Sequence, residues 1–336
     1  MVVVSYHAAW HVWRVLAARM RSRSGASTSS PGFALAADND MTQREVFGRP
    51  LRPRVSICLN SYNHARWLAD AIESALSQTF RDFEIVIVDD GSTDGSYDIA
   101  RSYEREDEPP IRVLTHSQRR NLGVAYSMNL GFREGIGEYW AWLPSDDRWY
   151  PDKLSSQVAY LDQNREVAFV YGYADVIDED GRVSSDSPIG IDITGSRDPL
   201  RRVIEGNVVP AMTVMTRRSC VEAVGGLDDS LVYNDWELWI RLMARWNAGF
   251  ISKPLAQFRV HSYNTSVGMA REVDARRRIA VLRSVLAKSS TVQGRLYEPR
   301  TRAALYVELA RVYFETGRLE SAKRRARAIG AALLPR

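Results

Sequence analysis

Short apolar runs alternate with segments of helical periodicity from Val55 onward, and this alternation restricts the fold more than any other feature. The runs at 55–60, 83–88, 111–116 and 139–143 have the length and content of buried strands. Between them, apolar residues recur at helical spacing over 67–76, 97–104 and 124–134. This order predicts βαβ units, and therefore an α/β fold with a mostly parallel sheet flanked by helices. Right-handed crossovers place the carboxyl ends of the strands at one edge, where such sheets bind ligands.

Polar residues follow three of these strands at that edge. The segments are NSYN at 60–63, DDGS at 89–92 and SDD at 145–147. Asp and Ser are favoured helix N-caps, so capping alone explains Ser92 or Asp94. Four carboxylates gathered at one edge would repel one another, which raises their pKa values or recruits a cation. We therefore expect a divalent metal at this edge.

Charge is unevenly distributed along the 336 residues, although the net charge is only +4. Residues 271–336 carry 16 Lys and Arg against 6 Asp and Glu, so the rest of the chain is mildly acidic. A basic tail of this kind fits an anionic membrane face, a nucleic acid or an acidic partner. A solvated helical surface accounts for the charge equally well.

The two cysteines, Cys58 and Cys220, both lie in apolar stretches. Two thiols are too few for a disulfide framework, so we expect buried packing residues in a reducing compartment, the cytoplasm. Residues 1–53 have a different character, with a Ser-rich segment of a kind that rarely folds. They are interpreted as a disordered extension, a wrongly assigned start with Met41 as the alternative, an interfacial helix or a targeting peptide.

Several motifs in a fixed order resemble the inverting glycosyltransferases of family 2, which have the GT-A fold. They are VSICLNSYNHARWLADAIESALSQTFRDFEIVIVDDGSTDGS, NLGVAYSMNLGFREGIGEYWAWLPSDD, VGGLDDSLVYNDWELWIRL and FRVHSYNTS. The resemblance covers roughly residues 54–268. It implies a nucleotide-sugar donor, usually a UDP-sugar, held by a divalent metal.

The resemblance also implies roles for residues at the strand ends. Asn60 and Tyr62 match positions that meet the nucleotide, with Tyr62 placed to stack on the base. Asp90 matches the carboxylate that contacts the base edge, and Asp89 supports its loop. Asn129 matches a position near the donor ribose.

The metal-binding motif of the family corresponds to the segment after the fourth strand. Asp146 matches its metal-binding acid, with Asp147 as a helper and Ser145 on the donor side. Many relatives have an acid where this chain has Pro144, so the motif here is SDD. His261 matches a histidine near the diphosphate and is expected to complete the metal shell or to contact a phosphate; the alternative role is to order its loop. Oxygen ligands suit Mn²⁺ or Mg²⁺, and no Cys/His cluster offers a zinc site.

An acceptor hydroxyl needs a general base on the face of the sugar opposite the nucleotide. Asp235, in VYNDWELWIRL, matches the catalytic base of the family. The segment that follows it has helical spacing, so a helix N-cap is the alternative role for this carboxylate. Both roles are compatible. Arg241 is expected to pair with a carboxylate rather than with substrate.

The function expected from this resemblance is transfer of a sugar to a surface-polysaccharide or lipid-linked glycan acceptor. Two alternatives remain: a nucleotidyltransferase, and a non-catalytic sugar-nucleotide-binding protein that acts through its basic tail. A nucleotidyltransferase would normally carry a Gly-rich, basic loop after the first strand, where this chain has NSYNHA. A non-catalytic protein would have little reason to retain Asp90, Asp146 and Asp235 together.

Three regions are expected: the extension at 1–53, a GT-A domain at 54–268 and a basic helical tail at 269–336. Within the tail, 303–328 resembles one tetratricopeptide-like hairpin, which cannot form a solenoid by itself. We expect it to pack on the GT-A domain or on a second copy of the chain in a homodimer. The basic tail further predicts peripheral contact with the inner face of the plasma membrane, and no nucleic-acid partner is expected.

Overall fold

The structure is a computed structural model, and it describes residues 52–184, 188–264, 270–288 and 298–317. The chain divides into two units, Met1–Leu51 and Arg52–Arg336. Nearly all of the expected N-terminal extension and the second half of the expected helical hairpin lie outside the described residues.

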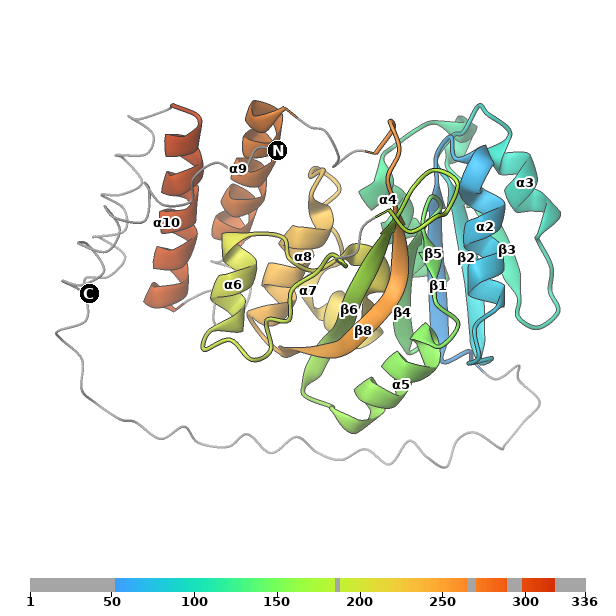
Figure 1. The fold of residues 1–336 in the computed structure, drawn as a ribbon, viewed down its shortest axis with the longest axis horizontal. Coiled ribbons are helices and arrows are strands. Elements are labelled where there is room, and N and C mark those ends of the chain that lie inside the picture. Colours follow the sequence, from blue (N-terminus) through green and yellow to red (C-terminus); the bar gives the residue numbers. More distant parts are fainter. Residues whose placement is uncertain (1–51, 185–187, 265–269, 289–297, 318–336) are drawn as a thin grey trace. The chain divides into compact units, whose positions relative to one another are not determined.

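The first half of this unit is a run of alternating strands and helices, as the sequence predicts (Figure 1). The strands and helices of this half are β1 (Val55–Ser61), α2 (Ala65–Leu76), β2 (Phe83–Asp89), α3 (Ser96–Ser102), β3 (Ile111–Thr115), the 3₁₀ turn η1 (Ser117–Arg119), α4 (Val124–Glu134) and β4 (Tyr139–Pro144). The four predicted strands and three predicted helices are therefore confirmed.

The second half completes the sheet and adds helices beyond it. Its elements are β5 (Arg148–Trp149), α5 (Lys153–Gln163), β6 (Val167–Ile177), α6 (Pro199–Glu205), the 3₁₀ turn η2 (Ala211–Thr213), β7 (Met215–Arg217), α7 (Arg218–Val224), α8 (Asn234–Met243), β8 (Asn247–Arg259), α9 (Arg271–Lys288) and α10 (Pro299–Glu315). The helical pattern read after Asp235 corresponds to α8.

The strands form one sheet in the order β3-β2-β1-β4-β7-β6-β8-β5. The pairs β1–β2, β1–β4, β2–β3 and β6–β8 are parallel, whereas β7 and β5 run antiparallel to their neighbours. In this register Asn60 lies opposite Pro144, and Ser61 lies opposite Asp89. The polar segments after β1, β2 and β4 thus begin side by side at the carboxyl edge.

Each face of the sheet has its own hydrophobic core. Along β1, Ile57 and Leu59 join the core that α2 and α5 cover, while Cys58 between them joins the core under α4. Gly131 lets α4 approach closely, because a Cβ at this position would collide with the Cys58 sulfur. Cys58 and Cys220 are both buried free thiols, as expected.

The helices after the sheet belong to the same compact unit. Residues of α8, α9 and α10 share the core that lies under α4, and α9 and α10 pack side by side (Figure 1). Arg311 of α10 also donates to the Glu205 carbonyl at the end of α6, at 3.4 Å. The first helix of the expected hairpin thus packs against α9 and α6, and the packing of the whole hairpin stays a prediction. Within the described ranges, no helix combines the length and the apolar content needed to cross a bilayer.

Lys153 is a fully buried cation beneath the sheet. Its Nζ donates to Gln157 Oε1 at 2.7 Å and to the Val214 carbonyl at 3.4 Å, and it lies 3.9 Å from the centre of the Trp149 ring. These partners are uncharged, and burial lowers the pKa of Lys153 well below its ordinary 10.5. The folded protein therefore binds this proton more weakly than the unfolded chain does.

We predict that Lys153 makes the free energy of unfolding rise with pH up to an ordinary lysine pKa of 10.5. Below the lowered pKa, the folded and the unfolded protein both hold the proton, so the folded protein carries the full cost of a buried charge. Above pH 10.5, neither state holds the proton and that cost is absent. In Lys153→Met the rise should be smaller, because the titrating group is absent. Urea unfolding of both proteins from about pH 7 to pH 10 measures the difference. Parallel curves would show that Lys153 keeps an ordinary pKa.

Candidate functional site

A carboxylate and two imidazoles meet at the carboxyl edge of the sheet. Asp146 follows β4, His261 follows β8, and His64 immediately precedes α2. Asp146 Oδ2 lies 3.0 Å from His261 Nε2, and Asp146 Oδ1 lies 3.9 Å from His64 Nδ1. One ligand atom from each residue lies within 4.8 Å of the other two, a spacing that can hold a metal ion. The structure thus brings together Asp146 and His261, which the sequence predicted, and adds His64, which it did not.

The donor set fits a divalent cation. Burial lowers the pKa of His64, which keeps its ring neutral at neutral pH and leaves a lone pair for a metal. Nε2 of His261 faces Asp146 Oδ2 at 3.0 Å, and the Tyr263 backbone N–H lies 3.2 Å from its Nδ1. Two nitrogen ligands and one oxygen ligand favour Mn²⁺ and other transition metals over Mg²⁺.

Arg259, the last residue of β8, holds the turn that carries Asp146. Its Nε donates to the Asp146 carbonyl at 2.8 Å, and its backbone N–H donates to Asp147 Oδ1 at 2.9 Å. Asp147 is buried, and both burial and the neighbouring Asp146 charge raise its pKa well above the ordinary value. The Asp147 carboxylate therefore supports the turn from inside and lies outside the three-residue cluster.

Ser145 completes the turn and links it to α2. Its hydroxyl lies 2.8 Å from His64 Nδ1, and Ser145 itself is buried. The backbone N–H of His64 donates to Ser96 Oγ at 3.0 Å. The Trp67 ring stacks on His261 with ring centres 4.2 Å apart. Residues from three separate elements thus fix the cluster in place.

Asp90 and Asp89 shape the loops on the nucleotide side of this edge. Asp90 accepts hydrogen bonds from the N–H groups of Leu122 and Gly123 at 2.7 and 2.9 Å, and its Oδ1 lies 3.2 Å from His116 Nε2. Asp90 therefore organises the loop that leads into α4, and its expected contact with a base edge stays a prediction. Asp89 Oδ1 caps the turn by accepting from Gly91 and Ser92 at 3.2 and 3.0 Å.

Of three further residues that were expected to bind the donor, two form hydrogen bonds within the protein and one is exposed. Asn60 Oδ1 accepts from Trp142 Nε1 at 2.8 Å, whereas Tyr62 is 44% exposed at the edge and open to a stacking partner. Asn129 bonds with both of its amide groups to the Leu227 backbone, at 2.9 and 3.0 Å. Its side chain fastens the loop before α8, and its expected place near a donor ribose stays a prediction.

Asp235 lies in the first turn of α8, and that helix begins at Asn234. Its Oδ2 accepts from Asn207 Nδ2 at 2.9 Å. Burial raises the pKa of Asp235, and the Asn207 hydrogen bond lowers it by a smaller amount. Since the cap position belongs to Tyr233, Asp235 is a first-turn residue rather than the N-cap that the sequence suggested as its alternative.

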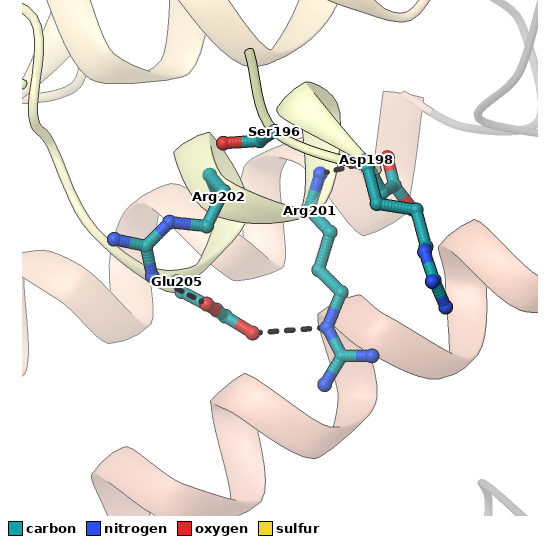
Figure 2. Close-up of a pocket in the computed structure, with 6 residues that line it drawn as sticks. Ser196, Asp198, Arg201, Arg202 and Glu205 are labelled. Atoms are coloured by element: carbon teal, nitrogen blue, oxygen red, sulfur yellow. Dashed lines mark hydrogen bonds and ion pairs between the residues drawn. The ribbon is translucent and has the colours of Figure 1, made fainter. Parts of the chain in front are cut away.

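A hollow of about 500 Å³ lies along α6 and is lined by none of these residues. Its lining consists of Ser196, Arg197, Asp198, Arg201, Arg202 and Glu205. Figure 2 shows the side chains of Arg201 and Arg202 turned toward Glu205, which both contact at 2.9 and 3.2 Å. The cationic groups are thus paired within the protein, and the hollow does not coincide with the strand-end site.

Arg241 is buried and pairs with Glu237 at 2.6 Å, as expected from the sequence. The residues that sequence reasoning missed are His64, His116, Asn207 and Arg259. His64 and Asn207 follow a strand and a short helix respectively, and only the folded chain shows what their side chains contact.

Comparison with known proteins gives a consistent result. The family model described as glycosyl transferase family 2 matches residues 56–223. An uncharacterized glycosyltransferase of Rickettsia typhi is 30% identical over 239 residues, which cover 66% of this chain and 70% of the relative. A putative teichuronic acid biosynthesis glycosyltransferase of Bacillus subtilis is 36% identical over 130 residues, covering 39% of this chain and 50% of the relative.

Solved structures share the fold at low identity. S. aureus TarS in complex with UDP-GlcNAc is 17% identical with a TM-score of 0.59, over 78% of this chain and 73% of that one. A mannosyltransferase from Pyrobaculum calidifontis in complex with GDP-Man and Mn²⁺ is 17% identical with a TM-score of 0.57, over 97% of this chain and 84% of that one. Both are GT-A glycosyltransferase structures, so the expected fold class is confirmed.

We predict that His64 determines which cation the cluster prefers. Wild-type protein should bind Mn²⁺ more tightly than Mg²⁺, because imidazole nitrogen is a poor ligand for Mg²⁺. His64→Ala should weaken Mn²⁺ binding by at least about tenfold and change Mg²⁺ binding less. Calorimetric titration with each metal alone measures both affinities. His116→Gln, a histidine outside the cluster, is the control, and equal losses for the two metals in His64→Ala would contradict the prediction.

Proposed function

The chain belongs to glycosyl transferase family 2, and from that premise we propose that it moves a sugar from a UDP-sugar to a glycan hydroxyl, with inversion at the anomeric carbon. The acceptor that we propose is a surface-polysaccharide or lipid-linked glycan. The observation that carries the proposal is the cluster of Asp146, His261 and His64 at the carboxyl edge of the sheet. Family membership argues against the alternative of a nucleotidyltransferase.

The nucleotide-sugar donor is proposed to bind beside this cluster. A divalent cation held by Asp146, His261 and His64 would neutralise the charge that develops on the leaving diphosphate. The loops of Asp89 and Asp90 lie beside it, and the exposed Tyr62 ring offers a stacking surface for a base. Complexes of UDP-GlcNAc and of GDP-Man with Mn²⁺ are known for proteins of the same fold, which supports a nucleotide-sugar donor.

The acceptor side is assigned to Asp235. A base works best when its pKa is close to the working pH, and burial moves the pKa of Asp235 in that direction. Its oxygen also keeps a neutral hydrogen-bond donor, Asn207, as a partner. The name of the B. subtilis relative, which refers to teichuronic acid biosynthesis, supports a polysaccharide acceptor.

We predict that Asp235→Asn separates transfer from donor binding. The amide keeps the size of the side chain but cannot accept a proton, so turnover should fall by about 10²–10⁴-fold while UDP affinity in Mn²⁺ is unchanged. Asp146→Ala should lose both turnover and UDP affinity. Turnover is measured as UDP release from UDP-GlcNAc with water as acceptor, and UDP affinity by calorimetry. Near-normal turnover of Asp235→Asn would remove Asp235 from catalysis.

The same reaction reports the stereochemistry. Attack on an α-linked donor from the face opposite the diphosphate should release the β anomer first, before the free sugar equilibrates. Proton NMR of the anomeric region during the first turnovers distinguishes the two anomers. Initial release of the α anomer would refute an inverting mechanism whatever the variants do.

A further prediction concerns the Asn207 hydrogen bond, which lowers the pKa of Asp235 against the effect of burial. A base acts only when deprotonated, so activity should fall as the pH drops through that pKa. In Asn207→Ala the opposing hydrogen bond is gone, and the acid limb of the kcat/KM profile should move to higher pH. Asn207→Asp should move it further, because a second carboxylate disfavours ionisation of the first. An acid limb that stays in place in both variants would show that it belongs to another group.

A further inference from the structure

Helix α9 lies beyond residues 56–223, which match the family model, yet it packs on the helix that carries Asp235. Ala275, Ile279 and Leu282 of α9 are buried in the same core as Trp236 and Trp239 of α8. This apolar contact fixes the distance between the two helices. Polar contacts at both ends of α9 then hold the start of α8 and the loop before it, which carry the proposed base.

At its N-terminal end, α9 contacts the N-cap residue of α8. The Tyr233 hydroxyl donates to Asp274 Oδ1 at 2.9 Å, and the Arg277 guanidinium lies 5.6 Å from the centre of the Tyr233 ring. Tyr233 is the N-cap residue of α8 and stands two residues before Asp235. A shift of Tyr233 would therefore be transmitted to the Asp235 carboxylate through the two residues of backbone that separate them.

At its C-terminal end, α9 reaches into a buried charge network. Lys288 Nζ lies 2.7 Å from Asp228 Oδ2 and 3.0 Å from Glu237 Oε1, and Ser284 Oγ donates to Asp228 Oδ2 at 2.8 Å. The Glu237 side chain is fully buried and also pairs with Arg241. Removing one charge from a buried network leaves its partners uncompensated, so the network resists displacement of α9.

The segment that leads into α8 is also held by residues outside α9. Arg241 donates to the carbonyls of Val224 and Gly226 at 2.5 and 2.6 Å. Gly226 has a φ of +74°, and a Cβ there would lie 2.9 Å from Asn129 Oδ1. The segment from 224 to 237 is thus fastened by α4, α8 and α9 together, and Asp235 is part of it.

We propose that α9 is a working part of the acceptor side of the active site, with Asp274 and Lys288 as positioning residues for Asp235. This inference rests on the proposed role of Asp235 as the base. Misplacement of a catalytic group by about 1 Å costs up to about 10²-fold in rate, even when the change is remote from the chemistry. Loosening α9 should therefore slow turnover and leave the metal and nucleotide sites, which other elements build, unaffected.

The first test removes one hydroxyl from the full chain. Tyr233→Phe keeps the aromatic ring and its packing but cannot bond Asp274. We expect turnover, measured as UDP release from UDP-GlcNAc, to fall about 10- to 100-fold. The affinity for UDP in Mn²⁺ and the melting temperature should stay at wild-type values. Asp274→Ala should have the same effect, and Asp274→Asn should restore most of the rate because its amide oxygen still accepts the bond.

A double variant shows whether the two residues act together. Tyr233→Phe combined with Asp274→Ala should lose less than the product of the two single losses, since the two changes share one hydrogen bond. Multiplied losses would overturn the assignment of Asp274 as the partner that positions Tyr233.

The second test concerns Lys288. Lys288→Met should lower turnover at unchanged UDP affinity, and Lys288→Arg should restore part of it. Arg276→Met is the matched control, because Arg276 pairs with Glu272 on the exposed face of the same helix, with 63% and 64% of the two side chains exposed. If Lys288→Met fails to fold, Tyr233→Phe still decides the question.

Comparison with Asp235→Asn separates this inference from the proposed function. If Asp235→Asn is inactive while folded Tyr233→Phe and Asp274→Ala turn over normally, α9 has no positioning role and the inference fails alone. For Tyr233→Phe and Asp274→Ala, losses of turnover that parallel losses of UDP affinity or melting temperature would overturn it too, because they indicate a general structural role. If Asp235→Asn is itself active, the proposed base is wrong and the inference fails with it.

Discussion

The contact between Arg259 and the SDD turn is the constraint on which the site depends. Asp147 places a carboxylate inside the protein, beside the charge of Asp146, and burial there is costly without a donor. The backbone N–H of Arg259 meets the Asp147 carboxylate, and its guanidinium meets the Asp146 carbonyl. The guanidinium also contacts Asp70 of α2 at 3.0 Å. Arg259 at the end of β8 therefore links the turn after β4 to α2. Two residues further along the chain, His261 contacts Asp146.

The proposed acceptor side has an equivalent constraint, built from different elements. The loop before α8 is fastened by Asn129 from α4, by Arg241 from α8 and by Lys288 from α9. The proposed donor side thus depends on the sheet, whereas the proposed acceptor side depends on packed helices. A helix that follows the sheet domain in sequence can influence the acceptor side through these contacts and leave the strand ends unchanged.

Much of the fold and part of the site could be predicted from local sequence. The apolar runs and helical spacings gave the right strands and helices, because burial on both faces of a parallel sheet leaves a strong local pattern. Asp146 and His261 were expected near one metal, and the structure places them 3.0 Å apart. His64 was missed because a histidine in a polar loop carries no signal of what lies opposite. Asn129 was expected at a ribose, and only the folded chain shows that its amide is bonded to Leu227.

The sequence by itself determined the α/β order, the edge at which polar residues gather and the identity of the acids found there. Each of these follows from residue types and from spacings of a few positions. The tertiary structure alone decided which acid faces the cluster and which faces inward, since Asp146 and Asp147 are chemically identical neighbours. That choice depends on Arg259, which is 112 residues from Asp147 along the chain. Contacts at such separations are set by how strands pair and helices pack, and no local pattern records them.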